Sequence, residues 1–275
     1  MKRMTRSLLA GTAVTSMIVL AGCGGKGVED VPALSEIDDL MWETMQEEGS
    51  VTITADVEMF GNTENSELFS GASGEEDLSA TIYGPLDGSA TAIGFGDNDL
   101  MRAFGQDEAY MAGDGLFELI GAQALSDAEQ QQFDAATEEF ADTWIDLSDD
   151  FSDDAVEFKI SEIFETLQDG WNGEEDDDDT VVTRDDISDE GTHEVRDDID
   201  VWVYEGQNEG QELVLIADHD APRFYEISDD GQTMKFSKWG ETESPERPED
   251  SQVISQEEAQ ERIMEAMMSS AMSSN

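Results

Sequence analysis

Apolar positions first follow a helical period and then change at once to a period of two. Between Pro32 and Glu48, apolar residues recur at the spacing of one helix face, and proline suits the first turn of a helix. Gly49 is a natural end for that helix. From Val51 to Met59, apolar residues alternate with threonine and acidic residues. This alternation predicts a half-buried strand.

Two further series of short strands are separated by turn residues. The first series is Leu78–Tyr83, Ser89–Phe95, Leu100–Phe104 and Glu108–Met111. The second series is Thr180–Thr183, Gly191–Arg196, Asp200–Tyr204, Glu212–Ala217, Arg223–Ile227 and Thr233–Trp239.

Two of these predicted strands carry information about their faces. The segment Leu213–Ile216 is apolar on both faces, so it needs cover on both sides. In the next strand, alternation places Tyr225 and Ile227 on one face and Phe224 on the other.

Helical periodicity returns between the two series. It predicts helices from Ser126 to about Phe140 and from Val156 to Leu167, with an apolar return at Trp144–Leu147. An acidic loop at residues 174–179 follows. The order predicts an α+β fold in which a curved antiparallel sheet carries helices on one face.

The composition changes again after Gly240. A stretch rich in Glu, Ser, Pro and Asp is typical of a linker. A helix from Glu257 to about Ser270 follows, with a methionine-rich stripe. This helix either covers a groove or binds a partner, or it is a weakly docked tail. The weakly docked tail is the preferred interpretation.

The N-terminus carries an export signal. Basic residues at Lys2, Arg3 and Arg6 precede a short apolar run rich in small residues, which is the layout of a secretory signal peptide. The run ends in Leu20–Cys23, whose sequence Leu-Ala-Gly-Cys resembles the lipobox of bacterial lipoproteins. The resemblance implies that a diacylglycerol is attached to Cys23 and that cleavage leaves this residue as the new N-terminus. An ordinary cleaved signal before an incidental cysteine is the alternative.

Cysteine usage favours lipid attachment. The chain has a single cysteine, which excludes an intramolecular disulfide. Two acyl chains anchor a protein stably where one does not. The predicted organisation is therefore a signal peptide at residues 1–22, a flexible tether at 23–31, a folded domain at 32–243, and an acidic linker with a Met-rich helix at 244–275.

Charge limits the partners of the mature chain. Loss of the three basic residues of the signal leaves 10 basic residues against 68 acidic ones, a net charge of −58. We expect no nucleic-acid partner because phosphate binding needs Lys and Arg. An anionic membrane surface also repels such a domain, so the lipid must hold it there. The same charge favours a soluble monomer.

The order of elements behind a lipobox resembles the actinobacterial lipoproteins of the LppX/LprG type, which share the LolA-like fold. Two short stretches add to this resemblance, since Phe104–Met111 is similar to a hairpin of that group and Met234–Gly240 to its final strand. The resemblance implies a strongly curved antiparallel sheet, a half-barrel, with helices covering its concave face. It also implies an apolar cavity that takes the acyl chains of lipids.

No catalytic or cofactor motif stands out. The sequence Asp218-His219-Asp220 lacks the further ligands of a metal site, and a solvated turn histidine is the preferred interpretation. The acidic run lacks the spacing of a calcium loop. We therefore expect a protein without enzymatic activity, metal or cofactor.

Two functions are compatible with these observations. One is a membrane-anchored lipoprotein that binds or carries an acylated lipid, and the other is a surface interaction lipoprotein without lipid cargo. The candidate residues that line the cavity lie on the apolar faces of the strands: Val51, Ile53, Val57, Met59, Trp202, Tyr204, Leu213 and Leu215. The alternative is that these side chains form a filled core.

Overall fold

The structure is a computed structural model that describes residues 27–56, 79–95, 98–115, 137, 140–148, 159–173 and 182–273, the last eight by their backbone only. Its helices are α1 (Leu34–Glu48), α4 (Ile160–Trp171), the 3₁₀ turn η3 (Arg184–Asp186) and α5 (Gln256–Ser273). Its strands are β1 (Ser50–Asp56), β2 (Ser79–Pro85), β3 (Ala90–Phe95), β4 (Asn98–Phe104), β5 (Glu108–Ala112), β6 (Trp144–Asp146), β7 (Ile187–Arg196), β8 (Ile199–Gly206), β9 (Glu212–Ile216), β10 (Arg223–Asp229), β11 (Gln232–Ser237) and β12 (Val253–Ser255).

The described part of the chain is built on one 12-stranded sheet, in the order β12-β6-β5-β4-β3-β2-β1-β11-β10-β9-β8-β7. Every neighbouring pair is antiparallel except β12 with β6, which is parallel. The two strand series predicted from the sequence therefore join side by side, through the pairing of β1 with β11. The fold is α+β with a large, mostly antiparallel and open sheet.

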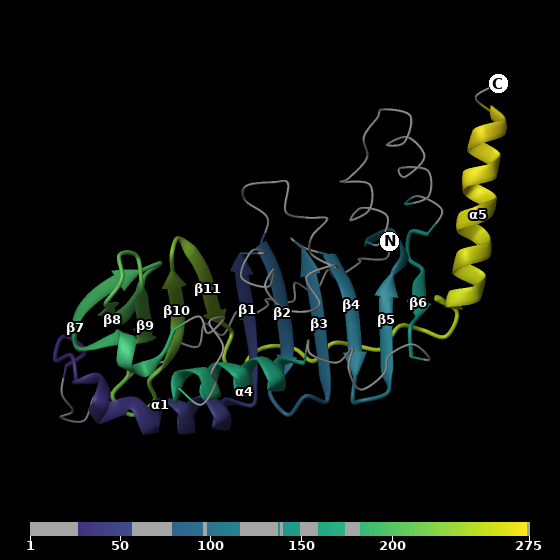
Figure 1. Cartoon of the computed structure of the whole chain (residues 1–275). Helices are drawn as coiled ribbons and strands as arrows, with labels where there is room; N and C mark the ends of the chain where they lie inside the picture. Colours follow the sequence, from purple (N-terminus) through teal and green to yellow (C-terminus); the bar gives the residue numbers. More distant parts are fainter. Residues whose placement is uncertain are drawn as a thin grey trace, which may run out of the picture.

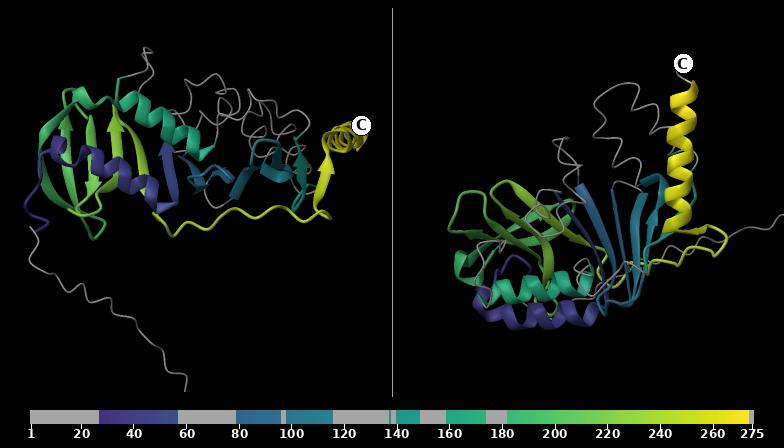
Figure 2. Two further views of the ribbon diagram at one scale, coloured as in Figure 1. Left: turned by 90° about the horizontal axis from the view of Figure 1, so that it is seen from below. Right: turned by 45° about the vertical axis from the view of Figure 1, so that its right-hand side comes forward.

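Helices α1 and α4 lie side by side across one face of this sheet, while α5 stands at the β12 edge (Figures 1 and 2). The predicted helical face of α1 is confirmed, since Leu34, Met41 and Met45 are fully buried. The helix ends at Gly49, whose φ of 81° is the left-handed conformation that glycine adopts most easily. We call the face under α1 and α4 the inner face and its opposite the outer face.

The prediction that Leu213–Ile216 needs cover on both sides is confirmed. Leu213 and Leu215 belong to the main core under the helices, whereas Val214 belongs to a second cluster on the outer face. That second cluster lies beside Arg196, which pairs with carboxylates of Glu212 and Glu226.

The predicted alternation in β10 is wrong. Phe224 and Ile227 both lie in the main core, and Tyr225 lies in the outer cluster. The cause is a β-bulge, because the register with β9 shifts between Phe224 and Glu226. An inserted residue reverses the side on which all later residues of the strand lie.

Three further predictions need correction. Val182 and Thr183 of the predicted strand Thr180–Thr183 are not in a strand. The apolar return at Trp144 is strand β6, and the predicted linker contains β12, which pairs with it. The predicted helix from Ser126 lies outside the described residues, apart from Thr137 and Phe140.

The segment that joins β11 to β12 lies along the outer face, and we call residues 241–252 the strap (Figure 2). The Thr242 hydroxyl lies 3.0 Å from that of Thr52 on β1, and the Glu246 carbonyl accepts a 2.9 Å hydrogen bond from Arg102 on β4. The strap thus crosses the sheet from its centre to its far edge and packs against it along the way.

Candidate functional site

Paired apolar side chains form a continuous row across the inner face. Each member lies directly opposite the next one on the neighbouring strand, so all share one face. The row runs from β11 to β12 as Phe236, Ile53, Ile82, Ile93, Met101, Met111, Ile145 and Ile254. Eight of the twelve described strands, from β11 to β12 in sheet order, thus contribute one apolar residue each to this row.

Six of the eight candidate lining residues lie together on this face. They are fully buried and belong to one core cluster with α1 and α4: Val51, Ile53, Trp202, Tyr204, Leu213 and Leu215. Val57 and Met59 lie outside the described residues, as does Cys23.

Six aromatic rings form a second feature of the same interior, which we call the aromatic cluster: Trp42, Phe164, Trp171, Phe224, Phe236 and Trp239. The Phe224 ring centroid lies 5.2 Å from that of Trp42 and 5.2 Å from that of Phe236. The cluster therefore connects α1 and α4 to strands β10 and β11. Sequence reasoning missed it because candidates were taken from strands alone, although Trp171 continues the apolar period of α4.

The aromatic cluster has two further properties that bear on ligand binding. The indole Nε1 of Trp42 is buried and has no hydrogen-bond partner among the described residues. In helix α4, which lies over the cluster, the side chains of Ile163, Phe164 and Leu167 are only half-buried. An unpaired buried donor costs free energy, so such a group favours the presence of an acceptor.

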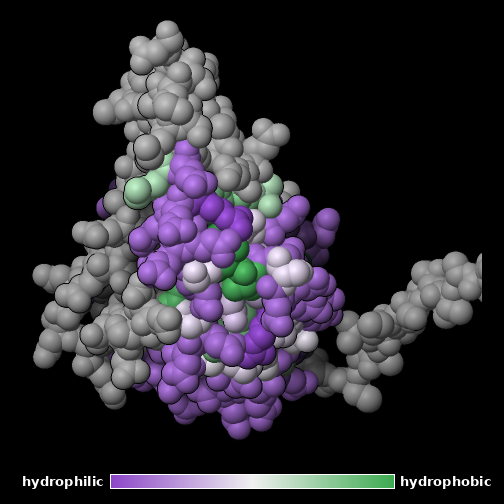
Figure 3. All heavy atoms as spheres, turned by 90° about the vertical axis from the view of Figure 1, so that its right-hand side faces the viewer, coloured by the Kyte–Doolittle hydropathy of each residue, from purple (hydrophilic) through white to green (hydrophobic). Residues whose placement is uncertain are grey.

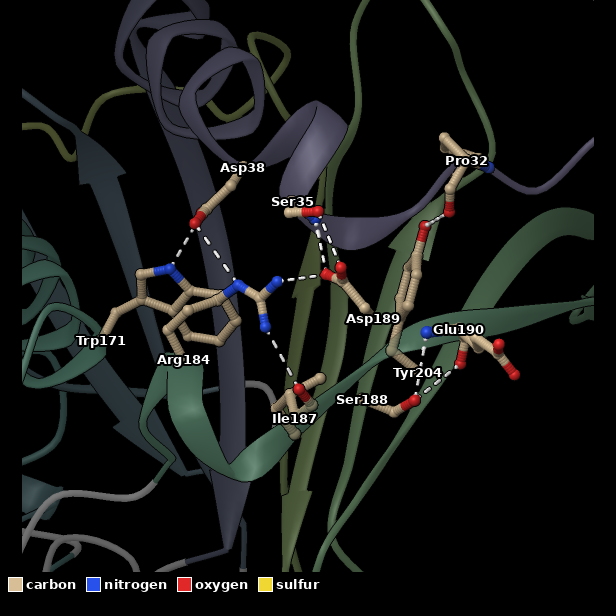
Figure 4. Close-up of polar contacts among 10 residues, drawn as sticks. All are labelled: Pro32, Ser35, Asp38, Trp171, Arg184, Ile187, Ser188, Asp189, Glu190 and Tyr204. Atoms are coloured by element: carbon tan, nitrogen blue, oxygen red, sulfur yellow. Dashed lines mark hydrogen bonds and ion pairs between the residues drawn. The ribbon is translucent and has the colours of Figure 1, made fainter.

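A polar network at the rim of the cluster connects α1, α4 and β7 (Figure 4). The Trp171 indole donates a 2.9 Å hydrogen bond to Asp38 on α1, and the Arg184 guanidinium lies 3.5 Å from the same carboxylate. Arg184 also pairs with Asp189 on β7, which accepts hydrogen bonds from the backbone and hydroxyl of Ser35. Asp189 thereby caps the amino end of α1.

The pKa values of the two carboxyls in this network are shifted in opposite directions. Burial raises the pKa of Asp38, against the lowering influence of the Trp171 hydrogen bond and the Arg184 charge. Hydrogen bonds from Ser35, assisted by Arg184, lower the pKa of Asp189. Arg184 is the cation that both carboxylates share, and its charge lowers the pKa of each.

A surface pocket of about 480 Å³ adjoins the start of α1. Its lining is Glu29, Asp30, Val31, Pro32, Ala33, Glu36 and Gly191. Three carboxylates among these residues make the pocket unsuitable for an acyl chain. It differs in chemistry from the apolar inner face, which it adjoins at Val31.

The residues just before α1 are held by the sheet, which differs from the predicted flexible tether over 23–31. The Val28 carbonyl accepts a 2.8 Å hydrogen bond from the Trp202 indole, and the Pro32 carbonyl accepts one of 3.0 Å from Tyr204. The Gly27 carbonyl lies 3.2 Å from Nε2 of His219. Only residues 23–26 remain as potential tether, and they lie outside the described part of the chain.

His219 has a packing role in place of the predicted solvated position. Its ring centroid lies 4.8 Å from that of Trp202, and the residue is half-buried. The other histidine, His193, lies 2.8 Å from a carboxylate oxygen of Asp200. Within the described ranges, no group of three potential ligands that would hold a metal ion is found; the acidic run at 174–179 lies outside them.

Comparisons with models of protein families, with curated proteins and with solved structures found no match to this chain. Among the described helices, none has the length and apolar character needed to cross a membrane.

Proposed function

We propose that the mature protein is an extracytoplasmic lipoprotein, anchored to the cell membrane by acylated Cys23, that binds the acyl chain of a lipid between α4 and the inner face. In this proposal the sheet is strongly curved, a half-barrel, and α1 and α4 cover its concave face. The protein acts by binding and not by catalysis. Its ligand is an acylated lipid.

The observation that carries the proposal is the aromatic cluster under a half-buried helix. An acyl chain placed along α4 removes the remaining exposed surface of Ile163, Phe164 and Leu167 from water. Burial of apolar surface contributes roughly 25 cal/mol per Å². The Trp42 indole, which has no partner among the described residues, supplies a donor for the carbonyl oxygen of an acyl ester.

Native mass spectrometry of protein purified from a membrane-competent host tests lipid binding directly. We expect an acylated lipid to co-purify with the wild-type protein. Phe164→Asp places a charge on the apolar side of α4 and should abolish the bound lipid, whereas Glu165→Gln, on the exposed side of the same helix, should retain it. Trp42→Phe keeps a ring but removes the donor, so it should retain the fold and lower lipid occupancy. Wild-type protein that repeatedly carries no lipid contradicts the proposal.

Fractionation of a Cys23→Ala variant tests the anchor. We expect this variant to leave the membrane fraction while its circular dichroism spectrum stays unchanged. A variant with a cleaved signal that still remains on the membrane shows that Cys23 is not the attachment point.

A surface interaction lipoprotein without cargo is the second candidate. It is favoured by the complete burial of the six described candidate lining residues, which is also what a filled core requires. A lipid-free wild-type protein that depends on Cys23 for membrane attachment would select this function.

A further inference from the structure

Three exposed apolar side chains gather at one end of the molecule. Among the described residues, the large apolar side chains exposed to solvent are Val28 at 36%, Val195 at 62%, Ile199 at 39% and Met264 at 63%. Val195 and Ile199 flank the turn between β7 and β8, and Val28 precedes α1. Only Met264, on α5, lies elsewhere.

Backbone and ring contacts bring these three side chains to the same strand end. The Ala217 amide, in the β9–β10 loop, donates a 2.9 Å hydrogen bond to the carbonyl of Asp200, the residue after Ile199. His219 of that loop packs on Trp202 and reaches the Gly27 carbonyl. The β7–β8 turn, the β9–β10 loop and the first described residues therefore form one surface, which we call the tether end.

Chain length connects the tether end to the acylation site. Four peptide units separate Cys23 from Gly27. Even a fully extended chain of this length spans only about 14 Å. Since Gly27 is held against His219, an acylated Cys23 keeps the tether end within about that distance of the lipid surface.

We propose that the tether end rests on the bilayer to which Cys23 is anchored, with Val28, Val195 and Ile199 in contact with lipid. This inference rests on the proposed lipid anchor. It adds the orientation of the domain. In this orientation the β8–β9 loop, at the opposite end of β8 from Ile199, lies on the side away from the membrane.

The charges of the tether end define the kind of surface that it fits. Asp197 and Asp198 occupy the β7–β8 turn, and Asp218 and Asp220 flank His219. The cation of this turn, Arg196, is paired with Glu194, Glu212 and Glu226. These carboxylates repel an anionic surface, so the contact made by the apolar side chains fits a zwitterionic surface better than an anionic one.

Fluorescence quenching in vesicles tests the orientation. The acylated full-length protein is reconstituted into phosphatidylcholine vesicles that contain a lipid-attached quencher. Because Cys23 is the sole cysteine and is blocked by acylation, Ile199→Cys supplies one thiol for a fluorophore. The matched control is Glu209→Cys, an exposed position in the loop at the other end of β8. We expect quenching at position 199 to be several-fold stronger than at position 209, and adding Val195→Ser should reduce it.

The outcomes separate the orientation from the anchor. Protein that does not float with the vesicles overturns both the anchor and the orientation. Protein that floats but shows equal quenching at the two positions overturns the orientation alone. A spectral change at position 199 without vesicles, together with a dimer in sedimentation, assigns the tether end to a second copy and also overturns the lipid contact. Stronger quenching in vesicles rich in phosphatidylserine than in phosphatidylcholine contradicts the apolar contact.

Discussion

The inner and outer faces of the sheet are stabilised by different kinds of contact. On the inner face, paired apolar residues and the aromatic cluster are shielded by α1 and α4. On the outer face, at strands β4 to β6, Arg102 lies 4.5 Å from the Trp144 ring centroid and Arg247 lies 4.7 Å from that of Phe104. The side of the molecule that carries β6 and α5 is largely hydrophilic, with apolar residues visible near its centre and a few more higher up (Figure 3).

This difference explains how an acidic chain uses its few cations. Each described arginine pairs with at least one carboxylate, and several of these pairs join separate elements. Arg223 on β10 pairs with Glu48 at the end of α1, and Arg247 of the strap pairs with Glu108 on β5. The apolar inner face supplies most of the stability, while arginines hold the periphery in place against the repulsion of like charges.

Truncation of an inner-face ring should give the largest effect. Phe236→Ala removes contacts with three other rings, those of Phe164, Phe224 and Trp239. We expect it to lower the free energy of unfolding by about 3–5 kcal/mol, measured by urea denaturation. Phe104→Ala, on the outer face, should cost less because that ring contacts only Tyr110 and Arg247 among the described ring contacts. Equal losses for the two variants would remove the distinction between the faces.

Tyrosine titration compares the faces without mutation. Burial, assisted by nearby carboxylates, raises the pKa of Tyr83 and of Tyr225 to about 12, and burial also raises the pKa of Tyr110 and Tyr204. These four are all the tyrosines of the chain. A folded-state pKa above the unfolded value of about 10 gives stability that is complete below pH 10 and is lost as pH rises through 12.

We therefore expect the absorbance at 295 nm that arises from Tyr83 and Tyr225 to rise only near pH 12, together with the loss of circular dichroism. Because burial is the first cause on both faces, Tyr110 and Tyr204 should also ionise above the usual pKa of a tyrosine. An absorbance step near pH 10 in a protein that remains folded would identify a tyrosine that is solvated instead.

Removal of the cation at the rim of the inner face should have an intermediate effect. Arg184→Gln leaves the half-buried Asp38 without its cation, and we expect a loss of about 1–3 kcal/mol in the free energy of unfolding. Without Arg184 the pKa of Asp38 rises further, so the loss should be greatest at neutral pH and should shrink as Asp38 becomes protonated. Arg262→Gln, which removes an exposed pair within α5, is the matched control and should change stability by less than about 0.5 kcal/mol. An equal loss at pH 4 and pH 7 would show that Arg184 does not act through Asp38.

The sequence predicts regular elements of this fold well, because their signals are local. Alternation identified the strands that became β1 to β5 and β7 to β11, although β7 begins at Ile187, before the predicted Gly191, and the two-sided apolar segment of β9 was assigned correctly. The bulge in β10 escaped detection because regular alternation across the polar residue Glu226 places Tyr225 and Ile227 on one face, whereas the register shifts between Phe224 and Glu226.

Long-range features were not predictable from local patterns. Strands β6 and β12 have three residues each and pair across more than one hundred positions of the chain, so neither shows a period of its own. The partners of Arg184, Arg223 and Arg247 are equally remote, and 68 acidic residues offer too many candidates. For the site, the apolar strand faces were predicted from the sequence. The aromatic rings contributed by helices and the hydrogen bonds that hold residues 27–32 form only when the sheet is assembled, so local patterns did not predict them.

Loss of the strap cation should have the smallest effect on global stability and the clearest local one. The Arg247–Glu108 pair is well exposed, with side chains 60% and 43% accessible, and such pairs contribute about 0–1 kcal/mol. Arg247→Ala should therefore change urea unfolding by less than about 1 kcal/mol while opening the strap, because local opening needs only the contacts of that segment. Limited digestion with a glutamate-specific protease should cut the variant within residues 241–252 faster than the wild type, whereas Arg262→Gln should leave the rate unchanged. Cleavage that follows only global unfolding in both proteins would mean that the strap opens with the sheet, and the outer face would then share the cooperativity of the inner one.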